Sequence, residues 1–419
     1  MIAKISKAQA KFISQAFFIS VFNQMMSSSI NFVLGIYLVR TLTPAEFGLY
    51  NISFAICLFF TGMGSAMLLT QMVVFTPDRA PEDQPRYAAC IFVLVIAFCI
   101  ATLLFLNLIF FFDNLLCKLV IQHTYYIAVA AASVACLLKE FFIRYAYNIR
   151  KEIWALFVNG SLAIFLIIML WIQNFYSSRL TIEKVLSIYA AAHLCAVIVG
   201  QRLVRLQFRG ITKRVLLVDF REAWQGGRWA CLTNLVYFAR IHAHTFIVMI
   251  LIGPMGVATL NAARLLVTPA AMLTPAISQI LMPRLATLRA YGSHKVTKVG
   301  LIISMGLLIL ALIYSTVLLS AYEYIIPLII GNNNYPDLFI ITLWWCGYVC
   351  ILGVRNGSEL SNQVLKKFKY LSFANSVSAI VSLVATYALT VIYNLTGAQV
   401  GLLIGEIVLI GFLWIKARW

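Results

Sequence analysis

A permanent cation and two imidazoles lie in one apolar stretch near the middle of the chain, Y237-F-A-R-I-H-A-H-T-F-I-V-M-I-L-I-G-P254. The stretch has the composition of a membrane-spanning helix, which would hold Arg240, His242 and His244 at membrane depth. An Arg at the middle of such a helix costs about 2.5–3.5 kcal/mol, so Arg240 is expected to have a use. Two alternatives are open. Arg240 binds an anion in a cavity, or it forms a buried ion pair with a carboxylate such as Glu406.

Two apolar stretches carry a polar stripe at helical spacing. Residues i, i+4, i+7 and i+11 lie on one face of a helix. Such a face turns toward a protein interior or a watery cavity, because lipid cannot satisfy its polar groups. We therefore expect two cavity-lining stripes: Ser20, Gln24, Ser27 and Asn31 in the first stretch, and Thr233, Tyr237, Arg240 and His244 in the seventh. His242 points elsewhere, and we expect it to pack as a hydrogen-bonded side chain.

A second set of charges within the apolar stretches suggests further roles. Arg264 is another candidate for the cavity, with snorkelling to the membrane interface as its alternative. Arg355 and Glu359 are one helical turn apart and could neutralise each other. Glu406 has no partner near it in sequence, so it could bind a proton or Na⁺, or pair with Arg240. Glu406 and Glu359 are the candidates for ion coupling.

Two more charges, Lys139 and Glu140, also lie within an apolar stretch, and the sequence assigns them no role.

The composition identifies the class of protein. Of the 419 residues, 62% are apolar and 11% are charged, which is too few charges to cover a soluble protein of this length. We predict an all-α polytopic membrane protein. Its twelve expected spans are 16–39, 48–70, 88–111, 121–143, 153–174, 182–200, 229–252, 257–281, 299–321, 337–358, 370–393 and 397–415.

The distribution of Lys and Arg predicts the orientation. Most of them lie in the two tails and in the loops between even and odd spans, whereas the opposite loops hold Arg40, Lys118, Arg179 and Lys184. Cytoplasmic loops accumulate Lys and Arg, so both termini are expected in the cytoplasm. The net charge of +18 then signals orientation and attraction to anionic membrane lipids, with no need for nucleic acid. The first span is expected to be retained, because no signal-peptide cleavage site follows it.

The spans divide into two similar halves. We predict a six-helix lobe over 1–200, a basic amphipathic cytoplasmic linker over 201–228, and a second six-helix lobe over 229–419. After the first and seventh spans, Pro44 matches Pro254 and Asn51 matches Asn261 at one constant offset. Matching span counts and this register favour duplicated lobes related by an axis along the membrane normal.

Catalytic and metal motifs are not found in the sequence. The nine cysteines have no CxxC or Cys/His metal spacing, and apolar packing is the better explanation for Cys346 and Cys350. The outward loops are short and carry no set of acid, base and nucleophile. We expect no cofactor and no enzymatic activity.

Two segments resemble the polysaccharide-exporter flippases of the Wzx type, the PST family. They are N31-F-V-L-G-I-Y-L-V-R-T-L-T-P-A-E-F-G-L-Y-N51, and I247-V-M-I-L-I-G-P-M-G-V-A-T-L-N-A-A-R-L-L266 followed by I280-L-M-P-R-L-A-T-L288. The resemblance implies the fold of the multidrug and lipid II exporters, with two lobes around a central cavity lined by cations. By matching position, that role would fall to Arg240, His244 and Arg264.

The chain departs from the family in two places. Ala258 and Leu260 stand where the second motif usually has Gly and Tyr, and the first span lacks the Asp of proton-coupled multidrug exporters.

The resemblance and the cationic stripe together predict a flippase for undecaprenyl-diphosphate-linked oligosaccharide in the bacterial inner membrane. It would work by alternating access, with possible coupling to a proton or sodium gradient, and other polysaccharide assembly proteins are possible partners. One alternative is a cation-coupled multidrug antiporter of the same fold, although its cargo would be repelled by a cationic stripe. The other is a membrane enzyme of polysaccharide assembly.

Overall fold

The computed structural model describes residues 7–116, 123–176, 179–331 and 333–417, and over these it contains helices and connecting turns without any strand. The long helices are α1 (Lys7–Thr41), α2 (Pro44–Gly64), α4 (Gln84–Leu116), α5 (His123–Asn148), α6 (Glu152–Phe175), α7 (Ile182–Leu203), α8 (Lys213–Leu251), α9 (Pro254–Leu288), α10 (Ser293–Ser320), α12 (Leu338–Val364) and α13 (Phe368–Ala417). Two short helices are α3 (Thr70–Phe75) and α11 (Tyr322–Ile329).

Each of the twelve predicted spans is confirmed as a helix over its described residues, and 121–122 of the fourth span lie outside them. The second continues from α2 through a π-helical turn, Ser65–Leu69, into α3. The last two are both within α13, whose backbone turns at Asn394, where φ is 53° and ψ is −134°. Within the described residues, ten helices are long and apolar enough to cross a membrane, one of them the double-length α13. Helices satisfy their own backbone hydrogen bonds, which a segment in hydrocarbon requires.

The predicted linker over 201–228 differs from the structure at both ends. Helix α7 runs to Leu203, and α8 begins at Lys213, so 213–228 is continuous with the seventh span. Tertiary contacts account for this early start. Arg79, in the connection before α4, forms ion pairs with Asp219 and Glu222 of α8. These pairs use the two acidic residues of a segment that, by composition alone, resembled a basic surface helix.

Contacts between Cα atoms divide the chain into two units. Unit 1 contains Met1–Ile30 and Ser53–Asn234, and unit 2 contains Asn31–Ile52 and Leu235–Trp419. The boundaries fall inside α1, α2 and α8. Residues 31–52 therefore belong with the C-terminal half of the chain, whereas sequence analysis assigned them to the N-terminal lobe.

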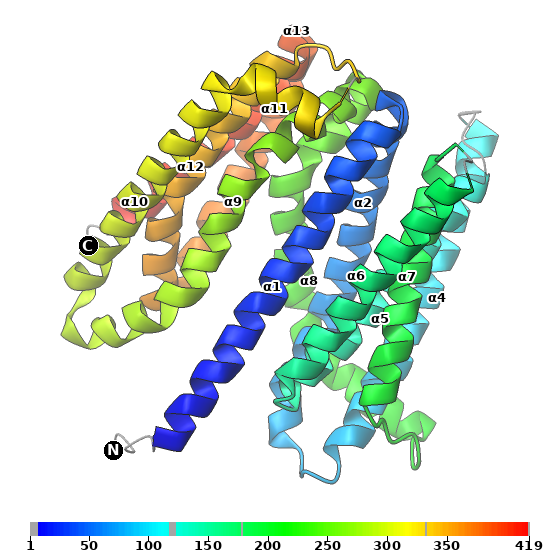
Figure 1. Cartoon of the computed structure of the whole chain (residues 1–419). Helices are drawn as coiled ribbons and strands as arrows, with labels where there is room; N and C mark the ends of the chain where they lie inside the picture. The colour runs from blue at the N-terminus through cyan, green and yellow to red at the C-terminus, as the bar shows by residue number, and fades with distance from the viewer. Residues whose placement is uncertain (1–6, 117–122, 177–178, 332, 418–419) are drawn as a thin grey trace. The chain divides into compact units, whose positions relative to one another are not determined.

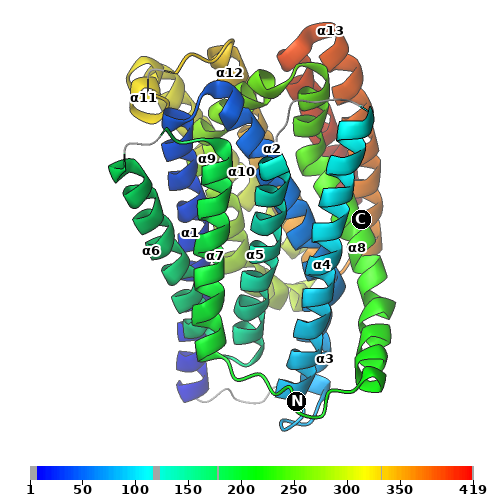
Figure 2. The ribbon, with the colours of Figure 1, turned by 90° about the vertical axis from the view of Figure 1, so that its right-hand side faces the viewer.

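Unit 1 is built around α5. This helix packs against α4, α6 and α7, and α4 and α7 lie beside it in Figure 2. Its buried core is aromatic: the ring of Phe92 lies 4.9 Å from Phe141 and 5.6 Å from Phe142, between ring centroids. Each of these rings buries a large apolar area, and ring pairs prefer a few specific geometries, so the rings orient the helices that carry them. The result is a rigid frame for the polar side chains of α5.

Unit 2 is built around α12, which packs against α9, α10 and α13; α9, α10 and α12 are side by side in Figure 1. Small residues allow α10 and α12 to approach closely. A β-carbon on Gly357 would meet the carbonyl oxygen of Gly300 at 1.9 Å, so only glycine fits there. Close backbone approach through small residues is typical of helix packing in membranes, where no hydrophobic force drives helices together. This packing fixes the face of α12 that carries its charges.

The turn between α1 and α2 is held inside unit 2. The Asn333 side-chain amide donates hydrogen bonds to the carbonyls of Val39 (2.8 Å) and Leu42 (3.1 Å), which the end of α1 leaves without helical partners. The Tyr335 hydroxyl donates to the Val39 carbonyl as well, at 3.2 Å. Near the start of α2, a β-carbon at Gly48 would lie 1.9 Å from the carbonyl oxygen of Pro254. These contacts explain why 31–52 clusters with the C-terminal half.

Replacing Gly48 tests this packing. We expect Gly48→Val to lower the free energy of unfolding by about 1–3 kcal/mol, because the Pro254 backbone cannot move aside as a side chain would. Gly306→Ala is the matched control, since a β-carbon there meets nothing within 4 Å. It should raise stability by about 0.5–1 kcal/mol through helix propensity alone. Thermal unfolding of the purified protein in detergent measures both, and equal melting temperatures for wild type and Gly48→Val would contradict the packing.

Candidate functional site

The predicted polar stripe of α8 divides into an exposed part and a buried part. Thr233 and Tyr237 are exposed, whereas Arg240 and His244 are buried. The Tyr237 ring still lies near the cation of Arg240, with its centroid 5.8 Å from the guanidinium carbon. Within unit 2, the stripe therefore leads from the exposed Tyr237 to the buried Arg240 and His244.

Arg240 forms an ion pair with Glu406 of α13. Its Nη1 lies 2.8 Å from the Glu406 Oε1, and the two side chains are 3% and 2% exposed. This is the second of the two alternatives that the sequence left open. A buried guanidinium is strongly stabilised by a carboxylate in hydrogen-bonding geometry, because the surroundings cannot solvate it.

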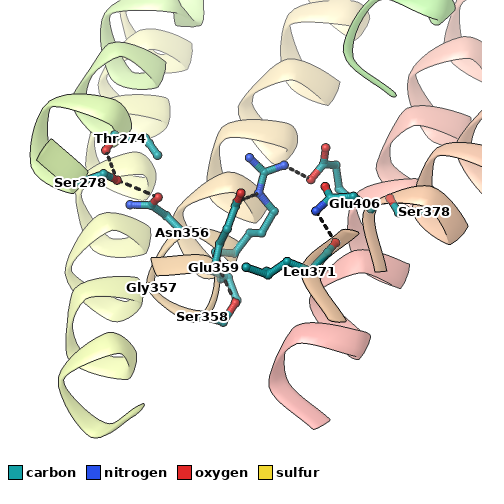
Figure 3. Close-up of polar contacts among 12 residues, drawn as sticks. Thr274, Ser278, Asn356, Gly357, Ser358, Glu359, Leu371, Ser378 and Glu406 are labelled. Carbon is teal, nitrogen blue, oxygen red and sulfur yellow. Dashed lines mark hydrogen bonds and ion pairs between the residues drawn. The ribbon is translucent and has the colours of Figure 1, made fainter. Parts of the chain in front are cut away.

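Glu406 accepts a second guanidinium. The Arg355 Nη1 on α12 lies 2.5 Å from the other Glu406 oxygen, Oε2. Arg355 also pairs with Glu359, one turn along the same helix, with 3.2 Å between Nε and Oε2. Dashed lines in Figure 3 join this guanidinium to the labelled carboxylates Glu359 and Glu406. We call Arg240, Glu406, Arg355 and Glu359 the four-charge network.

The four-charge network is electrically neutral. Two guanidinium charges, on Arg240 and Arg355, balance two carboxylate charges, on Glu406 and Glu359. Both Glu406 oxygens are already occupied by arginine nitrogens. A sodium ion or proton at Glu406 would have to displace one of them, so Glu359 is the more accessible of the two carboxylates, with 25% of its side chain exposed.

Arg264 of α9 is a cation without such compensation. Within the described residues, no carboxylate lies within ion-pair distance of its guanidinium. Its neighbour is instead an aromatic ring: the guanidinium carbon lies 5.9 Å from the centroid of Trp345 on α12. A cation over an aromatic face gains about 0.5–2 kcal/mol, which is less than a buried carboxylate would supply. Arg264 therefore keeps its capacity to bind an anion.

The surroundings of Arg264 are polar and aromatic. His242, His244, Tyr237 and Tyr348 all lie within electrostatic range of its charge. The Trp345 ring contacts His244 at 6.1 Å and Tyr348 at 5.1 Å between centroids, and its Nε1 donates to the Leu260 carbonyl at 3.0 Å. That last hydrogen bond fixes the ring beneath the cation. Unit 2 thus brings Arg264, His244 and Tyr237 together. His242, expected to pack, stacks on Phe238 at 4.8 Å.

The candidates on the first span are in different units. Gln24 lies in unit 1, where it lines a pocket of about 340 Å³ with Asn23 and Lys139. Asn31 is exposed and belongs to unit 2. Asn23, a buried polar residue of α1, was not among the predicted residues because it lies off the predicted stripe.

The sequence likewise assigned no role to Lys139, and for Arg355 it predicted only the nearby partner Glu359. The sequence did contain an indication for Lys139, because a charged residue within an apolar span is unfavourable and usually marks a functional site.

A family model described as "Polysaccharide biosynthesis protein" matches residues 13–289 of this chain. The chain belongs to this family. A search of curated proteins finds no match.

Solved structures show the same fold. A lipid II flippase, MurJ, in an inward closed conformation is similar with a TM-score of 0.74 and 12% identity, over 96% of this chain and 88% of that one. An inward-facing multidrug resistance transporter of the MATE family has a TM-score of 0.65 and 13% identity, over 96% and 98%. A MOP superfamily transporter from Pyrococcus furiosus is similar with a TM-score of 0.62 and 12% identity, over 96% of this chain and 94% of that one. The ten membrane-length helices and this fold make the chain a multi-pass membrane protein.

Removing Glu406 tests the four-charge network. We expect Glu406→Gln to lower the free energy of unfolding by about 3–5 kcal/mol, because Arg240 and Arg355 would lose their shared buried anion. Glu359→Gln should cost about 0–1 kcal/mol, since that carboxylate is partly exposed. The melting temperature in detergent measures both.

A double variant, Arg240→Met with Glu406→Met, checks the cause. It removes one charge of each sign and leaves Arg355 paired with Glu359, so it should be more stable than Glu406→Gln alone. A Glu406→Gln protein that melts with the wild type would contradict the network.

Proposed function

We propose that this protein is a flippase that moves undecaprenyl-diphosphate-linked oligosaccharide from the cytoplasmic to the outer leaflet of the bacterial inner membrane. The observation that carries the proposal is the uncompensated guanidinium of Arg264 among His244, Tyr237 and Trp345. Membership in the polysaccharide biosynthesis family and the fold shared with a lipid II flippase support it.

The cargo explains why such a cation is kept inside a membrane. A diphosphate with attached sugars cannot cross hydrocarbon unaided, whereas its polyprenyl chain dissolves there. The planar guanidinium of Arg264 offers paired donors to phosphate oxygens. The aromatic rings of Trp345 and Tyr237 suit the apolar faces of sugars, and the tail remains in lipid. Alternating opening to each side then carries the head group across without any covalent step.

Charge balance supports Arg264 as the arginine that acts on the cargo. The interior of unit 2 holds Arg240, Arg355 and Arg264 against Glu406 and Glu359, and the pairing leaves the excess positive charge on Arg264. In this proposal Arg240 positions α8 against α13 through Glu406, and His244 and Tyr237 complete the head-group site. Asn31, which also belongs to unit 2, contributes a polar contact from the first span.

A cation-coupled multidrug antiporter of the same fold is the alternative function, and MATE-family structures share the fold. The excess positive charge at Arg264 favours an anionic cargo over an organic cation, since like charges repel. Drug-resistance assays on expressing cells separate the two functions. An enzyme of polysaccharide assembly is disfavoured, because the solved structures that share the fold are a flippase and transporters.

We assign coupling to a proton or sodium gradient to Glu359, while Glu406 balances the charges of Arg240 and Arg355. In this proposal both termini lie in the cytoplasm, which the excess of Lys and Arg in the tails and in the loops on that side supports. Anionic lipids and other polysaccharide assembly proteins are the further partners of the proposal.

Arg264 provides the main functional test. We expect Arg264→Gln to reduce flipping of lipid-linked sugar in reconstituted vesicles roughly tenfold or more, because the diphosphate would lose its charge-assisted hydrogen bonds. Arg264→Lys keeps the charge without the planar guanidinium, so its flipping rate should lie between those of the wild type and Arg264→Gln. Arg221→Gln, at an exposed position of α8, is the control and should flip at the wild-type rate. A well-folded Arg264→Gln protein with undiminished flipping would refute the role.

Coupling is tested by removing the charge of Glu359. Glu359→Gln should flip at a rate that no longer responds to collapse of the ion gradient, because the exchangeable carboxylate is gone. Glu82→Gln, at an exposed position, should keep the wild-type response. A normal gradient response in Glu359→Gln vesicles would rule out coupling at this residue.

A further inference from the structure

A polar pocket lies inside unit 1, among α1, α3, α5 and α6. It has a volume of about 340 Å³, and Asn23, Gln24, Lys139, Tyr147 and Asn159 are among the residues that line it. Such a set is unusual at membrane depth, where unsatisfied polar groups are expensive. None of these residues belongs to the Arg264 site, which lies wholly in unit 2.

Lys139 is the charged centre of this pocket. The residue is 9% exposed, and its Nζ donates to the Asn159 Oδ1 at 3.2 Å. Within the described part of the chain, no carboxylate lies within ion-pair distance of this ammonium. The adjacent Glu140 is engaged elsewhere, with its Oε1 2.8 Å from the Nε of Arg144. A buried ammonium carries three donors, so two of them are left for a ligand.

The hydrogen bonds around Lys139 all run in one direction. Lys139 donates to Asn159, the Asn159 Nδ2 donates to the Asn23 Oδ1 at 2.9 Å, and the Asn23 Nδ2 donates to the Tyr147 hydroxyl at 2.7 Å. The oxygens of both amides are therefore used within the chain of hydrogen bonds. Lys139 and the second hydrogens of the two amides remain as N–H donors that a ligand in the pocket could use.

The net charge of the pocket lining and its free N–H donors together indicate the chemical class of the ligand. Lys139 and Arg144 carry two positive charges against the one negative charge of Glu140, so the lining is positive by one. A complementary ligand is rich in acceptors and negatively charged, as a phosphate or diphosphate is. We propose that this pocket is a second binding site, in which Lys139 binds a phosphate-class oxyanion. The proposal deepens the proposed function, on which it rests for its natural ligand, the diphosphate head group of the cargo.

The test measures equilibrium binding by purified protein in phosphatidylcholine nanodiscs, without transport. The probes are undecaprenyl diphosphate, undecaprenol and inorganic pyrophosphate. We expect Lys139→Gln to weaken binding of undecaprenyl diphosphate roughly tenfold, while Lys139→Arg retains most of it. Lys151→Gln, which removes an exposed ammonium at the start of α6, is the matched control and should bind as wild type.

A second variant separates ligand binding from a structural role. Asn159→Asp places a carboxylate beside the Lys139 ammonium, so it should abolish oxyanion binding and preserve or raise the melting temperature. If Lys139 only ties α5 to α6, Asn159→Asp would strengthen that tie and leave binding unchanged. Unchanged binding in folded Lys139→Gln and Asn159→Asp proteins would overturn the proposal.

The three probes identify the source of the oxyanion. Binding of undecaprenyl diphosphate that excess undecaprenol does not displace supports a lipid head group, and equally tight binding of inorganic pyrophosphate supports a free phosphate. A protein that fails to flip lipid-linked sugar but binds pyrophosphate through Lys139 would lose the proposed function and keep this site. A protein that flips normally with binding indifferent to Lys139 would keep the function and lose the site.

Discussion

A charge inside hydrocarbon must be compensated by the protein, and the bond between Arg240 and Glu406 is where this constraint is most severe. Both side chains are almost fully buried, so each charge needs a counter-charge from the protein, and each supplies one to the other. Their pairing joins α8 to α13, and the second bond from Arg355 to Glu406 joins α12 to the same point. Three helices of unit 2 are thus held in register by one carboxylate. The packing of small residues between α10 and α12 builds on that register.

Because of the same constraint, a cation that no carboxylate compensates indicates a binding site for an anion. Arg264 rests on an aromatic ring, and Lys139 rests on an amide, and neither neighbour supplies a full negative charge. Keeping such cations at membrane depth is unfavourable for stability alone, which is why we assign both of them to an anionic cargo. Arg240, at the middle of its apolar stretch, is the strongest single candidate in the sequence. Depth, however, is also what forces a cation to acquire a counter-charge.

Close backbone contact is the second organising feature of the molecule. The turn between α1 and α2 packs so tightly on Pro254 that Gly48 has no room for a side chain, and Asn333 satisfies the carbonyls that the end of α1 exposes. This turn belongs by sequence to the first half of the chain and by contact to unit 2. The duplicated register of Pro44 and Pro254 places two similar turns in the sequence, and only the structure makes a contact between them apparent.

The sequence by itself determined the twelve helices, their approximate ends and the class of protein, because hydropathy is a property of about twenty consecutive residues. It also selected Arg264, His244 and Tyr237, which the structure brings together. Only the tertiary structure decided that Arg240 is neutralised, that Arg355 shares Glu406, and that Lys139 and Asn23 face one pocket. The partners Arg240 and Glu406 are 166 residues apart, and no periodicity along one helix reports which charge a distant helix presents to it.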